Sequence, residues 1–595
     1  MPQPAATNAS STAAVLSCRI TLGEQARELD KTANVLSVWV SQAVNRIPYA
    51  RICLSDGDVT TGTFALADSG MLVPGTRIGI ALGYGSDEAT VFTGLVTSVS
   101  ERISSRSSEM IVEARDEAVK MTLIPGNRHF TDITDSDLAT QLIESHGLTA
   151  DVETTDVPYQ NLVQYNTSDW DFLVSRMDRQ GRIVLAGDGA VSARRPDLRA
   201  KAAADVRFGE NLLEFNASVD ARTQISALSI SAWNPATQEI ETTDTGYQED
   251  TAGNLSPGEL TDALKTTAMD IRSAAPLGQQ ERQHLADARK MRNVLGKIRG
   301  RVKFFGDGHV HAGDLINLKG VGARFSGSAF VGAVTHEYAA GGWTTEATIG
   351  MAPEWFAQKV ASVPAGISGL AAAPGSATAN GATGLLSMIR GLQVGVVTDI
   401  VDPDGAFRVR VRLVGVSADQ QGVWARVATL DAGNMRGTFF RPEIGDEVIV
   451  GFIQDDPSFP VILGMMHSSQ LASPIAPAAD NNEKGYQSRE GLKLNFNDGL
   501  KSVTLETPAG KSLTLDEDQG VIRIQDENNN TMRFEGSGIT ITSGSDLTIQ
   551  ATGTLSLSGA SVAIKATSDL DLSAVSASVS GSGTTEITGA IVKIN

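Results

Sequence analysis

The stretch GITITSGSDLTIQATGTLSLSGASVAIKATSDLDLS, residues 538–573, repeats one short unit: two aliphatic residues in alternation, then a small polar turn. The same unit starts at Leu492 and recurs about every eight residues to the end of the sequence. Alternation with period two places both aliphatic side chains on one face of a short strand, while Gly, Ser, Asp and Asn supply the turns. The pairs are Val503/Leu505, Leu513/Leu515, Ile522/Ile524, Met532/Phe534, Ile539/Ile541, Leu547/Ile549, Leu555/Leu557, Val562/Ile564 and Leu570/Leu572.

This repeat is typical of a β-solenoid whose core one chain cannot fill. Beyond Phe534 it contains no aromatic residue and no proline, so each strand offers only two modest aliphatic side chains. A single-chain solenoid needs about 18 to 25 residues per coil, whereas rungs of about eight residues suit three chains that share each coil. We therefore predict that residues 491–595 form one third of a trimeric, triple-stranded β-helix needle.

The end of the repeat predicts a contact with another protein. Its side chains become very small, and Val592 and Ile594 are expected to close the last rung. A blunt terminal rung exposes unpaired backbone groups and apolar side chains, so a separate capping protein is expected. The candidate contact residues are Ile591, Val592, Ile594 and Asn595.

Composition and charge limit the class of protein. At 595 residues the chain is long enough for about four domains. The formal net charge of −20 argues against a nucleic-acid or anionic-membrane partner. The first 17 residues lack Lys and Arg and resemble neither a secretory signal nor an anchor, and no stretch reaches the ~18 apolar residues of a membrane span. We expect an acidic assembly component that is made and assembled in the cytosol.

Two cysteines, Cys18 and Cys53, are the only ones in the chain. Two thiols in a chain of this length do not make a disulfide framework. We expect both to be buried thiols.

Two segments without regular patterning divide the chain. Residues 360–389 contain no charged residue. They are built largely from Ala, Gly, Ser, Thr and Pro, which is typical of a flexible linker. A second break, residues 468–485, carries two prolines and precedes the repeat region. The predicted parts are an N-terminal extension (1–17), a hub block (18–359), a linker (360–390), a small barrel (391–467), a linker (468–490) and the needle (491–595).

The hub block reads as mixed but mostly β. Residues 19–105 alternate short apolar runs with Gly and Asp turns, which indicates antiparallel strands. Helices are predicted over 132–146, over 168–180 with Ser168 or Asp169 as cap, and over 281–298. Strands are expected to resume at Arg301.

Several strings of the hub block, taken together and in order, resemble the hub domain of VgrG-type and phage-tail spike proteins. Residues 391–467 likewise resemble the OB-fold domain of these spikes, most clearly in PEIGDEV (442–448) and DDPSFP (455–460). Alternation of Val409, Val411 and Leu413 is what a small-barrel strand requires. The hub strings are VFTGLV (91–96), NTSDWDFL (166–173) with Arg176 and Gly181-Arg182, FGENLLEFNASVD (208–220) and GDLINLKGVGARFSGSAFVGAVTH (313–336).

The resemblance implies a fold and a role. Spikes of this family are homotrimers, mainly β with a minor α/β part, in which each hub chain contributes two β-barrel subdomains to a pseudo-sixfold ring. That ring docks onto a hexameric inner tube within the baseplate, and the OB-folds form a neck. The needle points forward, and contraction of an outer sheath drives it into the target cell envelope. A PAAR-repeat protein caps its tip, and some spikes also carry effectors.

The sequence offers little sign of catalysis, and we predict no enzyme activity, no cofactor and no metal. The break over residues 468–485 is shorter than 20 residues, which leaves no room for the lysozyme domain of some phage relatives. The motifs G-x-S-x-G, G-x-x-x-x-G-K-[ST] and H-E-x-x-H are absent. His309 and His311, with Asp307, could ligate a metal if they lie on a strand, but a polar strand or turn near the barrel rim is the preferred interpretation.

The OB-like block holds basic and aromatic residues that suit two interpretations. OB-folds often bind oligonucleotides through such residues, but the arginines could instead pair with acidic neighbours within a trimer, which we prefer. Trp170 and Trp424 are expected in the core or at an interface. The residues in question are Arg408, Arg410, Arg412, Arg426, Arg436, Arg441, Trp424 and Phe439.

Rival functions come from other classes. A trimeric adhesin fibre would explain the repeat but not the PEIGDEV domain. A carbohydrate-active solenoid enzyme would need aromatic and carboxylate grooves, which this repeat lacks. Among contractile machines, the compact plan favours an extracellular injection particle or a phage-like tail over a type VI secretion system.

Overall fold

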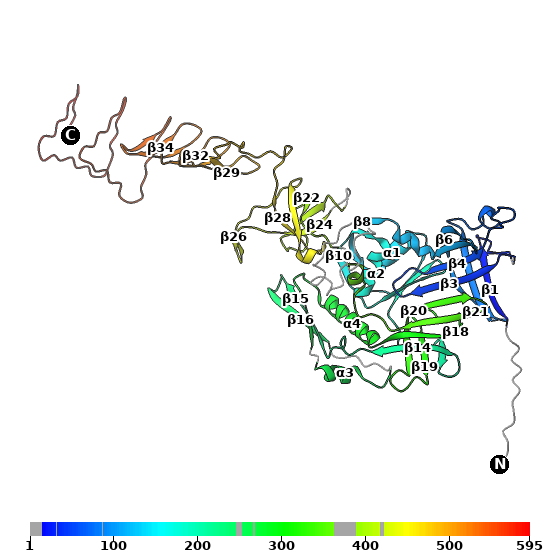
Figure 1. Cartoon of the computed structure of the whole chain (residues 1–595). Helices are drawn as coiled ribbons and strands as arrows, with labels where there is room; N and C mark the ends of the chain where they lie inside the picture. The colour runs from blue at the N-terminus through cyan, green and yellow to red at the C-terminus, as the bar shows by residue number, and fades with distance from the viewer. Residues whose placement is uncertain are drawn as a thin grey trace, which may run out of the picture. The chain divides into compact units, whose positions relative to one another are not determined.

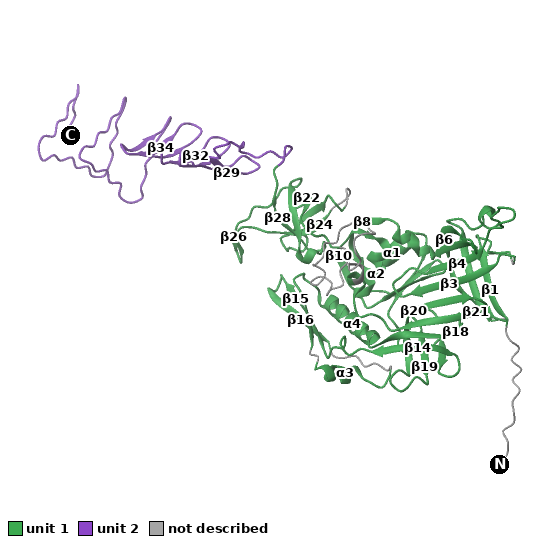
Figure 2. Cartoon of the chain, viewed as in Figure 1, with its two compact units in different colours: residues 1–467 green, residues 468–595 purple. Residues whose placement is uncertain are grey.

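The computed structural model describes residues 15–30, 32–85, 87–245, 253–265, 268–361, 388–416 and 422–594, and only the backbone of 359–361. The chain divides into two compact units, residues 1–467 and 468–595 (Figure 2). This division coincides with the start of the second predicted linker. Residues 1–14 of the predicted extension and 362–387 of the first predicted linker lie outside the described residues.

A 13-stranded sheet dominates the first unit (Figure 1). Its main path runs β14-β18-β21-β20-β3-β4-β7-β6-β5-β1-β2, and β19 pairs with both β20 and β13. The antiparallel strands predicted over 19–105 are confirmed, although the first strand already starts at Leu16, inside the predicted extension. The strands are β1 (Leu16–Leu22), β2 (Arg27–Glu28), β3 (Val35–Ala43), β4 (Tyr49–Ser55), β5 (Arg77–Tyr84), β6 (Asp87–Ile103), β7 (Ser108–Arg115), β13 (Ala204–Arg207), β14 (Leu212–Val219), β18 (Ile298–Phe305), β19 (Leu315–Lys319), β20 (Gly327–Ala339) and β21 (Gly342–Ile349).

Two apolar cores lie along this sheet. One gathers residues of β1 and β3–β7, and the other gathers residues of β13 and β18–β21. The sheet is continuous between them because β20 pairs with β3, with His336 opposite Val40. The described hub residues therefore form two cores on one shared sheet, and the two β-barrel subdomains that the resemblance implies stay a prediction.

Helices and three small sheets complete the hub. Ser168 caps α2 as predicted, because its Oγ accepts from the Asp171 backbone N–H at 3.1 Å, and Thr134 caps α1 in the same way. The predicted helix 281–298 is α4, whereas α3 and α5 were not predicted. The elements are β8 (Pro125–Thr134), α1 (Asp135–Glu144), β9 (Thr149–Val152), β10 (Pro158–Ser168), α2 (Asp169–Arg179), β11 (Ile183–Gly187), β12 (Ala190–Arg194), β15 (Leu228–Asn234), β16 (Glu239–Thr245), α3 (Pro257–Leu264), β17 (Met269–Ser273), α4 (Gln279–Gly296) and α5 (Phe356–Ala361).

Residues 391–467 form the predicted small barrel. Five strands close in the order β22-β23-β24-β28-β27. Val409, Val411, Val448 and Val450 are fully buried, and Val163 of the hub strand β10 packs into the same core. The barrel strands are β22 (Gln393–Asp399), β23 (Val409–Leu413), β24 (Val423–Val427), β27 (Glu447–Phe452) and β28 (Pro460–Met465), and a hairpin of β25 (Ala432–Gly433) and β26 (Arg436–Gly437) leaves the barrel between β24 and β27.

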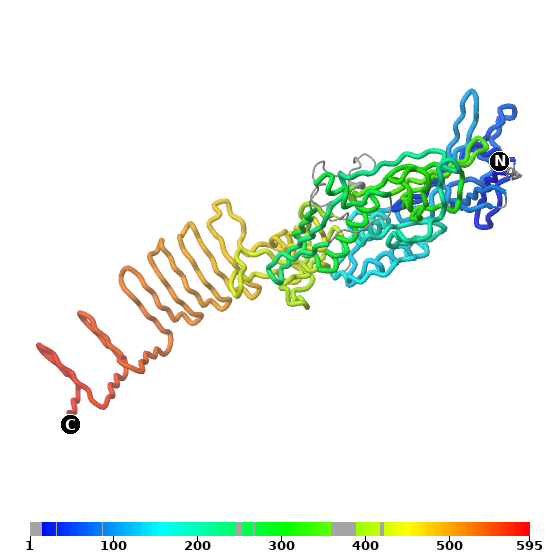
Figure 3. The backbone as a smooth tube through the Cα atoms, turned by 90° about the horizontal axis from the view of Figure 1, so that it is seen from below, coloured from blue at the N-terminus to red at the C-terminus, as the bar shows by residue number. Residues whose placement is uncertain are grey.

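The second unit is an antiparallel meander of seven strands (Figure 3). Its first strand lies inside the segment predicted as a linker, where polar and charged residues hide the alternation. Among the described residues after Thr542, no strand is formed. The strands are β29 (Glu483–Gln487), β30 (Lys493–Asn497), β31 (Ser502–Glu506), β32 (Ser512–Asp516), β33 (Val521–Gln525), β34 (Thr531–Glu535) and β35 (Gly538–Thr542).

No helix among the described residues is both long enough and apolar enough to cross a lipid bilayer.

Candidate interaction surfaces

Strands β31–β35 align their apolar residues in two columns, which we call the apolar ladder. Antiparallel pairing sets Leu505 opposite Leu513 and Leu515 opposite Ile522, and the pattern continues to Phe534 opposite Ile539. Seven of the ten ladder side chains remain 37–63% exposed, so one chain leaves them uncovered. Contiguous exposed apolar surface of this kind marks an interaction site. The ladder consists of Val503, Leu505, Leu513, Leu515, Ile522, Ile524, Met532, Phe534, Ile539 and Ile541.

The last repeats have the same alternation but no strand partner among the described residues of their own chain. Leu547/Ile549, Leu555/Leu557, Val562/Ile564 and Leu570/Leu572 lie outside any strand, and all eight side chains are exposed. Their prediction as strands of a needle shared by three chains stays a prediction. A strand needs a neighbour to receive its backbone hydrogen bonds, and the described residues of one chain provide none here.

The predicted tip residues are likewise uncovered. Ile591, Val592 and Ile594 are exposed, and Asn595 lies outside the described residues. No closed rung forms around them within the described chain. Their contact with a capping protein stays a prediction.

The barrel arginines meet acidic groups of their own chain. Arg408 Nη2 donates to Asp402 Oδ1 at 2.8 Å and to Asp404 Oδ2 at 2.6 Å, and these bonds hold the pKa of Asp402 well below its usual value. Arg436 pairs with Asp431 at 2.8 Å. The acidic neighbours expected within a trimer are thus found inside one chain, at least for these arginines.

The remaining barrel side chains pack against each other. Arg408 and Arg410 approach the half-buried Trp424 ring, and Arg441 approaches Phe439, at 5.6–5.9 Å. Arg441 also donates to the backbone carbonyls of Ile400 and Arg408. Trp170 of the hub is buried in the core, as predicted.

His309 and His311 lie in a turn between β18 and β19, not on a strand. They contact different carboxylates: His309 Nε2 lies 3.3 Å from Asp87 Oδ1, and His311 Nδ1 lies 3.6 Å from Asp314 Oδ2. Asp307 accepts from the His309 backbone N–H. Across the described ranges, no group of three or more His, Cys, Asp and Glu is arranged to hold a metal ion. The polar-turn interpretation describes this segment.

Both cysteines are half-buried rather than buried, which corrects the prediction, and neither forms a disulfide. Cys18 packs against the core of β1 and β3–β7, whereas Cys53 lies between the buried residues Ile52 and Leu54 and so faces the other side of β4. Burial, together with Glu88, raises the pKa of Cys18 to about 11. A thiol with so high a pKa is a weak nucleophile at neutral pH.

A buried ion pair joins α1 to α2 and was not predicted. Arg176 Nε donates to Asp135 Oδ1 at 2.6 Å, and the Arg176 guanidinium lies 4.4 Å from the centre of the Tyr159 ring. Gln180 donates to the other Asp135 oxygen at 2.6 Å. Because these residues are distant in sequence, no local pattern could have revealed the pairing.

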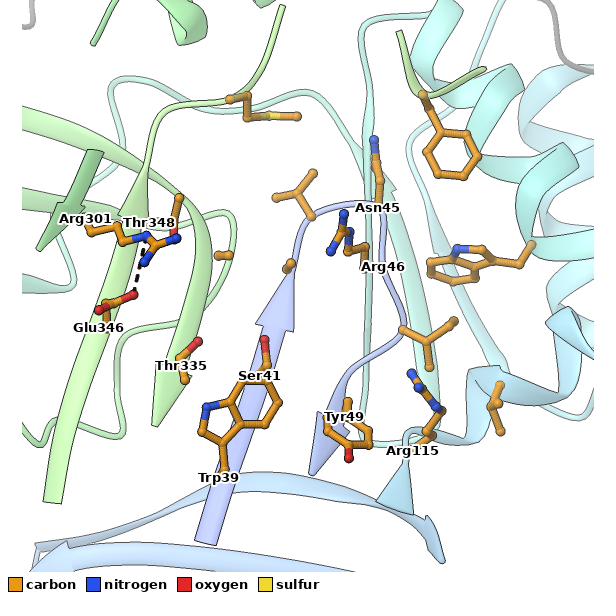
Figure 4. Close-up of a pocket in the computed structure, with 18 of the residues that line it drawn as sticks. Trp39, Ser41, Asn45, Arg46, Tyr49, Arg115, Arg301, Thr335, Glu346 and Thr348 are labelled. Carbon is orange, nitrogen blue, oxygen red and sulfur yellow. Dashed lines mark ion pairs between the residues drawn. The ribbon is translucent and has the colours of Figure 1, made fainter. Parts of the chain in front are cut away.

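The hub also has a cavity of about 950 Å³ on the outer face of β3, β18, β20 and β21 (Figure 4). Tyr49 packs edge-on against Trp39, and Arg115 lies 4.8 Å above the Tyr49 ring. Across the cavity Arg301 pairs with Glu346 at 3.9 Å, the contact marked by the dashed line. Mixed charges and hydroxyl groups line this cavity, which suits a polar protein contact.

Two family models match the chain. The model described as Alg8 N-terminal domain matches residues 14–340, which is more than half of the chain. The model described as type VI secretion system/phage-baseplate injector OB domain matches residues 393–467, the segment that forms the closed barrel.

Part of the chain is similar to curated proteins. The type VI secretion system spike proteins VgrG1b and VgrG1a of Pseudomonas aeruginosa are 32% identical over 124 and 122 residues. Each match covers 19% of this chain but only 17% and 19% of the relatives, so the chain spans less than a fifth of their length.

Among solved structures, the half-lidded Francisella PdpA-VgrG complex matches with a TM-score of 0.51 at 8% identity, covering 89% of this chain and 88% of that one. The lidless PdpA-VgrG complex matches with a TM-score of 0.50 at 8% identity, covering 89% and 98%. These likenesses show a shared fold. The chain belongs to the family of the Alg8 N-terminal domain.

Proposed function

We propose that this chain is the central spike of a contractile injection system, and that three copies assemble so that the second unit forms a membrane-puncturing needle. The observation that carries this proposal is the apolar ladder, which one chain leaves exposed. A mechanical role follows, rather than a catalytic one. The spike proteins among the curated relatives support it.

Sharing between three copies would cover the ladder. Fully burying a Leu or Ile side chain stabilises a structure by about 1.5–3 kcal/mol, so half-exposed ladder residues stand to gain roughly 1 kcal/mol each. The repeats after Thr542 would at the same time gain strand partners from the other copies. A closed prism of this kind has few free edges and resists bending, which is what a piercing needle requires.

The two ends of the chain have different proposed partners. The hub, with its large sheet, would dock onto the hexameric inner tube and the baseplate. A PAAR-repeat protein would cap the other end through Ile591, Val592, Ile594 and Asn595, and effector cargo could travel with the spike. Assembly would take place in the bacterial cytoplasm, as part of a phage tail-like particle that is released to act outside the cell.

The type of machine has a second candidate. The curated relatives are type VI secretion spikes, and the barrel model is described for type VI systems and phage baseplates. A type VI spike or a contractile phage tail is therefore the alternative to an extracellular particle. A trimeric adhesin has no such support.

Hydrogen exchange on the full chain tests the proposal. If three copies share the needle, amides of residues 543–594 exchange as slowly as those of β31–β35, because each strand has a partner. Rapid exchange over 543–594, beside slow exchange in β31–β35, would mean that the last repeats stay unpaired and would count against a shared needle.

A further inference from the structure

The hairpin that leaves the barrel, residues 428–441, carries apolar side chains that the described chain does not cover; we call it the arm. Its two strands are only two residues long, and an ion pair between Asp431 and Arg436 spans them. Leu430 and Met435 are 96% and 98% exposed, and Phe439 is also exposed. A short hairpin gains little stability by itself, so apolar residues at its end point to a partner surface.

A cavity of about 820 Å³ lies between the hub and the barrel, both of which belong to the first unit; we call it the junction pocket. Its volume lies in the range of about 300–1,000 Å³ that encloses ligands and side chains. Aromatic and aliphatic residues dominate its walls, and Phe407, one of them, is exposed. The apolar lining consists of Tyr159, Trp233, Leu277, Phe407, Trp424 and Phe459.

The arm and the pocket are neighbours along the chain but do not meet. Strand β24 supplies Trp424 and Arg426 to the pocket wall and then leads directly into the arm. No residue of 428–441 lines the junction pocket of its own chain. A chain therefore carries an apolar projection and an apolar recess that stay unmatched within it.

The pocket wall also carries charged residues, four of them arginines and three of them carboxylates (Glu281, Asp404 and Asp456). Arg426 on the pocket wall is exposed, and the described residues give its side chain no acidic partner. Arg176, which is buried in the same wall, has an Nη2 without a hydrogen-bond partner in the described structure. The arm carries Asp431, about half exposed, which can offer carboxylate oxygen to such a group.

We propose that the arm of one copy of this chain inserts into the junction pocket of a neighbouring copy. Met435 and Phe439 enter among the aromatic walls, where sulfur–aromatic contacts are favourable, and Asp431 approaches Arg426. This inference rests on the proposed trimer. A projection and a recess on the same chain make a head-to-tail contact, and such contacts close into a ring when the rotation between copies allows it.

The segment that joins the barrel to β29 favours a second copy of the chain as the partner that fills the junction pocket. Residues 468–482 join the barrel to β29 and reach no further than about 55 Å when fully extended. Copies that share the second unit must therefore hold their barrels near one another. A neighbouring arm is thereby supplied at high effective concentration to each pocket.

Engineered disulfides test the contact in the full chain. Ala406 lies on the pocket wall and Met435 on the arm, and both are exposed, so Ala406→Cys and Met435→Cys leave the fold intact. A disulfide requires Cα atoms about 4.4–6.8 Å apart. We expect the double variant to form covalent dimers and trimers on non-reducing gels, whereas each single variant stays largely uncrosslinked. The matched control is Ala406→Cys with Val59→Cys, an equally exposed hub position, which should not crosslink.

Light scattering on the same samples separates this proposal from the trimer itself. A trimeric mass without covalent dimers or trimers would overturn the arm contact and leave the spike proposal standing. A crosslink confined to single chains would also overturn it, because the arm would then reach its own pocket. A monomeric mass would overturn both.

Discussion

The barrel and the C-terminal sheet use the same alternation of apolar and polar residues, yet they bury it very differently. In the barrel, Val409 and Val411 are fully enclosed because five strands of one chain close on themselves. In the sheet, Leu515 and Ile522 stay about half exposed because seven strands remain open. Alternation thus predicts strands, but closure decides whether a single chain can cover them.

This difference separates two sources of stability. The barrel and hub are stabilised within one chain, so their stability should not depend on protein concentration. The sheet is stabilised, in our proposal, only when copies associate, so its order should depend on concentration. Variants in the two regions should therefore fail in different ways.

The largest expected effect is the loss of assembly on charging the ladder. Ile522→Asp would place a carboxylate where other copies are proposed to cover it, and an unpaired buried charge is strongly unfavourable. We expect the mass measured by light scattering to fall from three chains to one, with the barrel and hub still folded. Arg523→Gln, the adjacent residue on the opposite face, is the matched control and should stay trimeric. An Ile522→Asp protein that remains fully trimeric would break the comparison.

The converse variant acts on the barrel. Val411→Asp would bury a charge in a core that one chain closes, which should destabilise the barrel by about 4 kcal/mol. Denaturant unfolding should lose the barrel transition while light scattering still reports three chains. Val401→Asp, on an exposed residue of the same domain, should change little. If Val411→Asp instead dissociated the trimer and left the barrel transition intact, the barrel and not the C-terminal sheet would hold the copies together.

A pH experiment sharpens the hub side of the comparison. His336 is buried, and burial lowers its pKa to about 3, with the nearby His311 adding to the effect. Between pH 3 and the usual pKa of about 6.5, the unfolded chain binds a proton here that the folded chain does not. The hub should therefore lose stability as pH falls, by about 3 kcal/mol between pH 6.5 and pH 4 from this group.

The check is urea unfolding of the hub at both pH values for wild type and His336→Gln. In His336→Gln, the free energy of unfolding should fall by about 3 kcal/mol less than in wild type between pH 6.5 and pH 4. His467→Gln, which changes an exposed residue, should match wild type. Equal pH dependence in wild type and His336→Gln would mean that His336 does not titrate as its burial implies.

The smallest expected effect comes from a helix cap. Ser168→Ala removes the hydroxyl that accepts from the Asp171 N–H and should cost about 1 kcal/mol of hub stability. That loss should be the same at every protein concentration, because the hub folds within one chain. Ser537→Ala in the C-terminal sheet, which removes an exposed hydroxyl that donates to Glu535, serves as control. If the loss of stability in Ser168→Ala depended on protein concentration, the hub would not fold within one chain as we propose.

Local patterns predicted much of the fold. Alternation predicted the barrel strands and β31–β35, and Ser168 predicted the start of α2, because short-range sterics and hydrogen bonds govern these features. The OB-like strings also indicated the barrel, and a barrel model matches the same segment.

Features that depend on distant residues were not predictable. The Asp135–Arg176 pair joins two helices through the tertiary fold, and the two hub cores share one sheet only because β20 meets β3. The last repeats have strand-like sequences, yet residues 543–594 find no strand partner among the other described residues of their chain. A sequence specifies what a strand needs, but not which molecule supplies it.

The mass of the purified chain in solution tests the shared needle most directly. Light scattering of the full-length protein, repeated after truncation before Leu492, compares the two regions in one experiment. We predict a mass near three times the 62.5 kDa of the chain, which falls or becomes heterogeneous on truncation. A clean monomer of 62.5 kDa at full length would contradict the shared needle and would require one chain to cover its own ladder.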